Sequence, residues 1–80
     1  MALNKQQIKK EYAKKLLTVV KEEILDGEFD EMIAYFTDKK YWLQKNVESE
    51  FSEEEFSIIS NDIMFLRTLD KKIFDMIWNK

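Results

Sequence analysis

The sequence predicts an all-α fold, built as a small bundle of three helices, or of four if the second helix is broken. Its composition, 45% hydrophobic with 36% charged residues, is typical of a highly helical chain. Apolar residues recur with a helical period in three consecutive segments, and one of these begins with a clear capping signal. At 80 residues the chain is expected to form a single domain over residues 1–80.

The first helix is expected over residues 5–26. Asn4 is a good N-cap residue, and Gly27 can adopt the left-handed conformation that ends many helices. Apolar residues cover one half of this helix, which we expect to face the core. The opposite half carries a basic stripe, which is either a solvated face or a contact for phosphate groups. This stripe consists of Lys10, Lys14 and Lys21.

The second helix is expected over residues 28–47, with a break near Thr37–Asp38 as an alternative. Lys40 falls within its apolar stripe, and Asp38 could cap a short new helix. If the helix is continuous, Tyr35 and Trp42 lie on one side of it, outside the stripe that faces the core. The pair either packs against a neighbouring helix or forms part of a recognition surface for a partner.

The third helix is expected over residues 53–78. Ser52 and Glu55 have the spacing of a capping box, in which each side chain bonds the other residue's backbone N–H. Phe51 and Phe56 match the apolar pair that packs across such a helix start. These four residues place the beginning of the helix at residue 53.

Apolar residues cover at least half of the third helix, which is more than packing on one layer requires. Either both other helices contact it or one side meets another chain, so we expect a homo-oligomer, most simply a dimer. The residues expected at that interface are Ile58, Phe65, Leu69 and Met76. Asp62 and Asp70 interrupt the apolar arc. They are either polar determinants of an interface or ligand site, or are satisfied by Lys, Arg67 or a Tyr hydroxyl.

Catalysis is not expected from this composition. The chain has no Cys and no His, which excludes thiol nucleophiles, imidazole acid–base chemistry and the usual zinc ligands. Nothing singles out a catalytic pair from the 16 acidic residues. We therefore expect no enzyme activity, no cofactor and no metal. Without a membrane-spanning or signal-like apolar segment, the protein is expected to be cytoplasmic. A Lys-rich, Arg-poor composition indicates a bacterial or phage-infected host cell.

Negative charge is concentrated in the middle of the chain. Residues 28–62 carry three Lys and ten Asp or Glu, whereas the segments on either side are each net positive. An acidic segment beside aromatic rings suits docking on a basic protein, although it could equally be a solvated loop. The residues expected to bind the partner are the acidic Glu48, Glu50, Glu53 and Glu54 and the aromatic Tyr35, Trp42 and Phe51.

The function predicted first is therefore a protein–protein interaction module that acts stoichiometrically. It would resemble the inhibitors or regulators that phages and mobile elements direct against a host protein with a basic surface. One alternative is an oligomeric small-ligand or nucleotide-binding protein, with Tyr35 or Trp42 stacking on a base and Lys10 and Lys14 holding phosphate. A third is a DNA-binding helical module. Nucleic acid is the less favoured partner because the chain has a net charge of −3.

Overall fold

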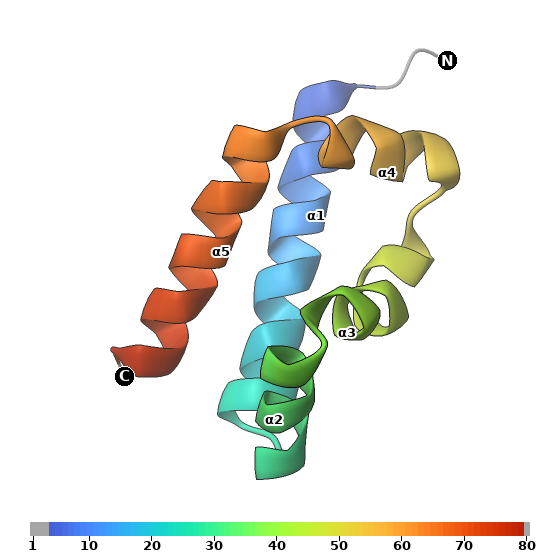
Figure 1. The fold of residues 1–80 in the computed structure, drawn as a ribbon. Helices are drawn as coiled ribbons and strands as arrows, with labels where there is room; N and C mark the ends of the chain where they lie inside the picture. Colours follow the sequence, from blue (N-terminus) through green and yellow to red (C-terminus); the bar gives the residue numbers. More distant parts are fainter. Residues whose placement is uncertain (1–3, 80) are drawn as a thin grey trace.

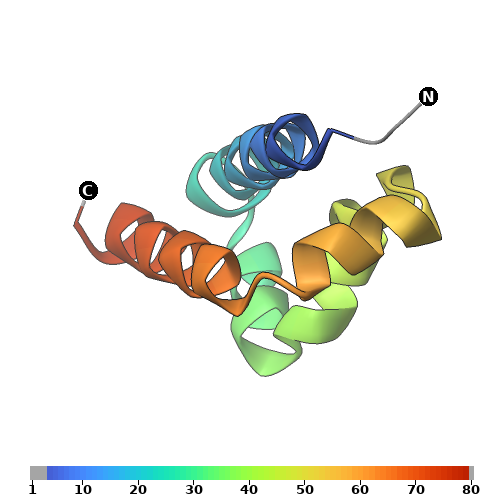
Figure 2. The same cartoon turned by 90° about the horizontal axis from the view of Figure 1, so that it is seen from above.

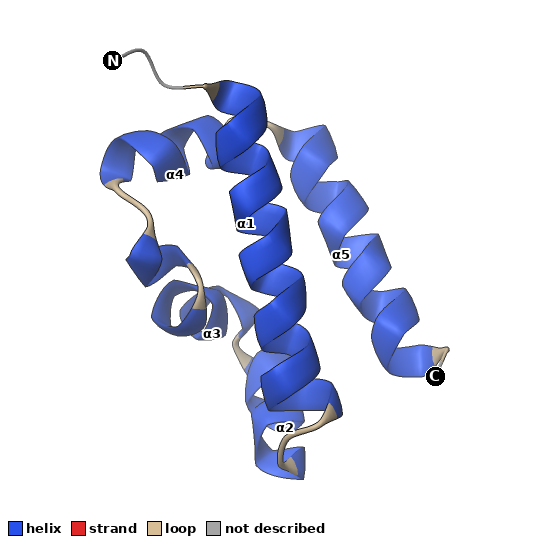
Figure 3. Cartoon of the chain, turned by 180° about the vertical axis from the view of Figure 1, so that it is seen from behind, coloured by secondary structure: helices blue, strands red, loops and turns tan. Residues whose placement is uncertain are grey.

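The computed structural model describes residues 4–79, and this part of the chain is helical throughout, with short connections (Figures 1 and 3). It contains five α-helices and two short turns of other helix types, and no strand within the described residues. The all-α helical bundle is thus confirmed, with more and shorter helices than expected. The elements are α1 (Lys5–Val19), the π-helical η1 (Val20–Leu25), α2 (Phe29–Thr37), α3 (Lys39–Asn46), the 3₁₀ turn η2 (Glu48–Glu50), α4 (Glu53–Ser60) and α5 (Ile63–Trp78).

The first predicted helix is present as α1 followed by η1. The Asn4 side chain accepts a hydrogen bond from the backbone N–H of Gln7 at 3.1 Å, so the predicted N-cap is confirmed. The expected left-handed Gly27 is wrong, because no glycine among the described residues has a positive φ. Glycine is needed there for space instead, since a Cβ at this position would collide with the backbone carbonyl of Glu23.

Of the two alternatives for the second helix, the structure has the broken one, with the break at Asp38. The Asp38 side chain accepts a hydrogen bond from the backbone N–H of Tyr41 at 3.1 Å, which begins α3 directly after α2. The continuous third helix over residues 53–78 is wrong. At Asn61 the chain leaves α4, and the Asp62 side chain accepts from the N–H of Phe65 at 3.1 Å, so that α5 starts as a separate helix.

The core lies between α1, α5 and the run of short helices from α2 to α4. Figure 2 shows these three parts surrounding a central space, which the buried side chains fill. The described chain is elongated, with principal extents of 41 × 22 × 18 Å. Its most completely buried side chains are Tyr12, Val20, Val47, Ile59 and Ile73.

Candidate functional site

An acidic groove lies where η2 leads into α4. Its volume is about 260 Å³. Three of the residues expected to bind a partner, Glu48, Phe51 and Glu53, line this one groove. The structure therefore brings together two carboxylates and one aromatic ring of the seven residues predicted to bind a partner. The full lining is Gln44, Glu48, Ser49, Phe51, Ser52, Glu53 and Phe56.

The capping box fixes the shape of this groove. Ser52 and Glu55 exchange both predicted hydrogen bonds, at 3.1 and 3.0 Å, so the start of α4 is confirmed at residue 53. Phe51, immediately before it, is extended, and its half-buried ring packs on Tyr12 with the ring centroids 5.5 Å apart. Glu53, in the first turn of α4, is exposed and lines the same groove.

Glu48 forms a hydrogen bond that its sequence neighbourhood does not reveal. The Tyr12 hydroxyl donates to the Glu48 carboxylate at 3.0 Å, across 36 positions of sequence. Burial raises the pKa of Glu48, while the bond from Tyr12 and the charge of Lys40 oppose that rise. Burial, followed by the adjacent Glu48 charge, likewise raises the pKa of Tyr12 above its usual range. The groove thus has a half-buried carboxylate held in place by a neutral donor.

The remaining three acids of the predicted set differ in how exposed they are to a partner. Glu50 forms an ion pair with Lys15 at 3.0 Å. Glu53 and Glu54 are exposed and take part in no ion pair within residues 4–79. These two residues are therefore the carboxylates most available to a partner.

Tyr35 and Trp42 do not form a recognition surface, and the prediction that they bind a partner is wrong. Only 2% of Tyr35 and 3% of Trp42 is exposed, and their rings meet edge to face with centroids 5.2 Å apart. The Trp42 indole N–H donates to the Glu31 carboxylate at 2.9 Å. The same burial removes them as rings that could stack on a nucleotide base. The alternative in which they pack between helices is the one observed.

The four residues expected at a self-association interface do not form an exposed surface. Leu69 is buried, and Ile58, Phe65 and Met76 are half-buried against the core. Their part in self-association stays a prediction, but the apolar arc from which it was inferred is divided at Asn61 between two helices, α4 and α5.

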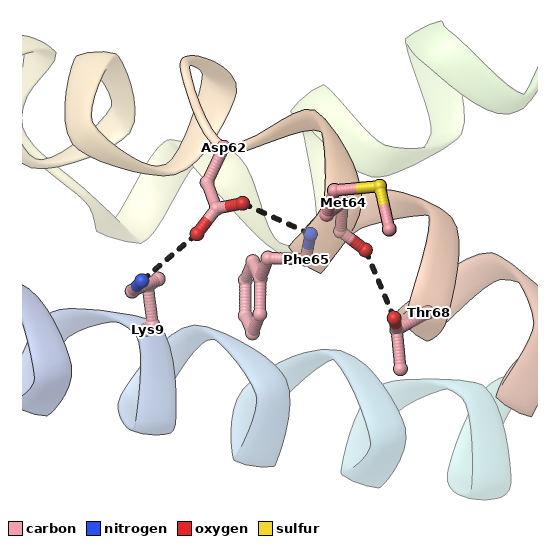
Figure 4. A network of polar contacts seen from close by, with 5 residues as sticks. All are labelled: Lys9, Asp62, Met64, Phe65 and Thr68. Carbon is pink, nitrogen blue, oxygen red and sulfur yellow. Dashed lines mark hydrogen bonds and ion pairs between the residues drawn. The ribbon is translucent and has the colours of Figure 1, made fainter.

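The two acids in the apolar arc are each paired with a lysine. Figure 4 shows Asp62 between its two partners, the Lys9 ammonium at 2.8 Å and the backbone N–H of Phe65. These hydrogen bonds lower the pKa of Asp62. Asp70 meets Lys39 at 3.4 Å. Both carboxylates are therefore paired with lysine, which is one of the predicted alternatives, and neither requires a ligand.

Comparison with known proteins gives no relative. No family model, curated protein or solved structure matches the chain. Among residues 4–79, no helix combines the length and apolar character needed to cross a bilayer. The same residues contain no cluster of three or more acidic side chains placed to hold a metal ion.

Proposed function

We propose that the protein acts stoichiometrically as a protein–protein interaction module, and that its acidic groove binds a basic segment of a protein partner. The observation that carries this proposal is the meeting of Glu48 and Glu53 with Phe51 and Phe56 in one groove. Carboxylates complement the charged head of a Lys or Arg side chain. Aromatic rings complement its apolar stem and its cationic group.

The surrounding charges favour a cationic ligand over an anionic one. Glu53 lines the groove, the exposed Glu54 follows it in the first turn of α4, and no Lys or Arg occurs between Lys45 and Arg67. Lys15 forms an ion pair with Glu50. Such an exposed ion pair is weak enough for a cationic side chain of a partner to replace Lys15. The phosphates of a nucleic acid would be repelled at this groove. We propose further that the protein is an inhibitor or regulator encoded by a phage or mobile element, and that its target is a basic host protein. It would act in the cytoplasm of a bacterial or infected cell.

A labelled peptide of alternating Lys and Ala provides a direct test by fluorescence anisotropy at low salt. We expect saturable binding that weakens as salt is added and about tenfold weaker binding by Glu53→Lys/Glu54→Lys. The matched control is Glu22→Lys/Glu23→Lys, which changes the net charge equally at the exposed η1 turn. This control should bind within about twofold of the wild type if the groove is the site. Equal losses in both variants, or no binding of the peptide, would overturn the proposal.

A further inference from the structure

A second surface, separate from the acidic groove, runs across α2 and the last turns of α5, away from α4 (Figure 1). It consists of five large apolar side chains that are each between 48% and 67% exposed. We call this surface the aromatic face. Its members are Phe29, Ile33 and Phe36 of α2 and Phe74 and Trp78 of α5.

The aromatic face is continuous from one helix to the other. Phe36 and Trp78 bring their ring centroids to 6.3 Å, and Phe74 and Trp78 to 5.9 Å. On α2, Phe29 and Ile33 precede Phe36 at one-turn spacings and lie along the same side of the helix. The stripe therefore passes from α5 through the Phe36–Trp78 contact and on to the beginning of α2.

The size of the aromatic face favours a protein interface. Four aromatic rings and one Ile, each about half exposed, present on the order of 500 Å² of apolar surface. This is in the upper part of the range for the largest patch on a monomer, and such patches are often functional. The chain exposes 6020 Å², compared with roughly 5,100 Å² for a compact protein of this mass. A partner that covers this face would bury surface that an 80-residue chain lacks the core to bury internally.

The two ends of the stripe carry opposite charge. Glu28 and Asp30 accompany its α2 end, while Arg67 and Lys71 share the exposed side of α5. Asp70, also on α5, is offset by its ion pair with Lys39, and the exposed Lys72 and Asp75 of the same helix add one charge of each sign. Counting the helical rise from the central Phe36–Trp78 contact, Asp30 lies roughly 9 Å away in one direction and Lys71 roughly 10 Å away in the other.

We propose that the aromatic face is the interface of a symmetric homodimer, in which α2 of one copy lies against α5 of the other. A two-fold axis through the Phe36–Trp78 contact places the α2 end of the stripe in one copy against the α5 end of the stripe in the other copy. The nearly equal spacings then place Asp30 opposite Lys71 twice in the dimer, and like charges are kept apart. The proposal does not depend on the acidic groove or on any ligand bound there.

Light scattering coupled to size exclusion tests the interface itself. The wild type should be a dimer at about 100 µM and dissociate on dilution, since the apolar area is modest. Phe74→Glu/Trp78→Glu should be monomeric at the same concentration. Met64→Glu is the matched control, because Met64 is 70% exposed on the same helix but lies near its other end. A monomeric wild type, or a dimer that survives the double substitution, would overturn the proposal.

A charge exchange tests the orientation of the two copies. Glu28→Lys/Asp30→Lys makes both ends of the stripe basic, and Arg67→Glu/Lys71→Glu makes both ends acidic. Each variant alone should self-associate at least tenfold more weakly at low salt. Mixed in equal amounts, the two variants should form a heterodimer, because each basic end of one variant then faces an acidic end of the other. All four residues are exposed, and circular dichroism verifies that the variants remain folded. Failure of the mixture to associate would refute the α2-to-α5 arrangement.

Discussion

The hydrogen bond between Tyr12 and Glu48 provides the sharpest test of the groove's internal structure. In Tyr12→Phe the ring and its contacts with Phe51 and Phe65 can remain, while the donor to Glu48 is lost. A half-buried carboxylate without its donor loses a charge-assisted hydrogen bond. Because water reaches part of Glu48, we expect the free energy of unfolding to fall by about 1.5 kcal/mol near pH 7.

The pH dependence of this loss identifies its cause. Burial raises the pKa of Glu48 above its ordinary 4.5, so the folded protein binds more protons than the unfolded chain in the window above that value. Stability from this group is therefore highest at low pH and decreases as pH rises through the window. The hydrogen bond from Tyr12 lowers the pKa of Glu48. Removing this bond therefore raises the pKa of Glu48 further and widens the pH range in which the folded protein binds more protons than the unfolded chain. The cost of Tyr12→Phe should consequently be smaller near pH 4 than near pH 7.

Urea unfolding followed by circular dichroism at both pH values measures these costs. Glu48→Gln provides the internal control, because it removes the charge whose desolvation causes the effect. In that background, Tyr12→Phe should cost less than about 1 kcal/mol, the net value of a neutral hydrogen bond, at either pH. An identical cost at both pH values, unchanged by Glu48→Gln, would refute this explanation of the groove.

Three further substitutions test the fold, each measured by the urea midpoint. Ile59→Ala should cost about 3 kcal/mol, because Ile59 is fully buried, whereas exposed Ile63→Ala should cost under about 0.5 kcal/mol. Asp62→Asn keeps a capping oxygen but loses the charge that pairs with Lys9. The lowered pKa of Asp62 contributes stability above its ordinary 3.8 that disappears as pH falls, and this acid-side loss should be smaller in the variant. Gly27→Ala should destabilise by about 1–2 kcal/mol, because the added Cβ would collide with backbone.

Helix starts could be predicted because their signals are local. Asn4, Asp38 and Ser52 each bond a backbone N–H three positions later, so a few adjacent residues contain the whole arrangement. Asp62 bonds Phe65 in the same way. The apolar periodicity continues past Asp62 and predicts one long helix there, with Asp62 as a polar interruption of the apolar arc. The local cap signal, given precedence over the periodicity, predicts the break.

The contacts of the acidic segment could not be predicted, because they join residues distant in sequence. Glu48 meets Tyr12, and Glu50 meets Lys15, through the packing of η2 beside α1. No spacing in the sequence encodes either pair. The burial of Trp42 is of the same kind, since the side of a helix that becomes buried depends on which other helix arrives there. The sequence shows that the candidate carboxylates lie in one segment, but which of them remain exposed depends on how the helices pack.

The two proposed surfaces can act independently because they are formed by different elements of the fold. The acidic groove is formed by η2 and the start of α4, whereas the aromatic face is formed by α2 and the last turns of α5. In Figure 1, α4 lies near the top of the molecule and α2 and the last turns of α5 lie near the bottom, with η2 beside α3 between them. A dimer joined at the aromatic face would therefore leave both grooves open. Two open grooves would let it bind a target with repeated basic segments more tightly than one groove could. Loss of the dimer through Phe74→Glu/Trp78→Glu would remove that advantage while leaving the affinity of a single groove unchanged.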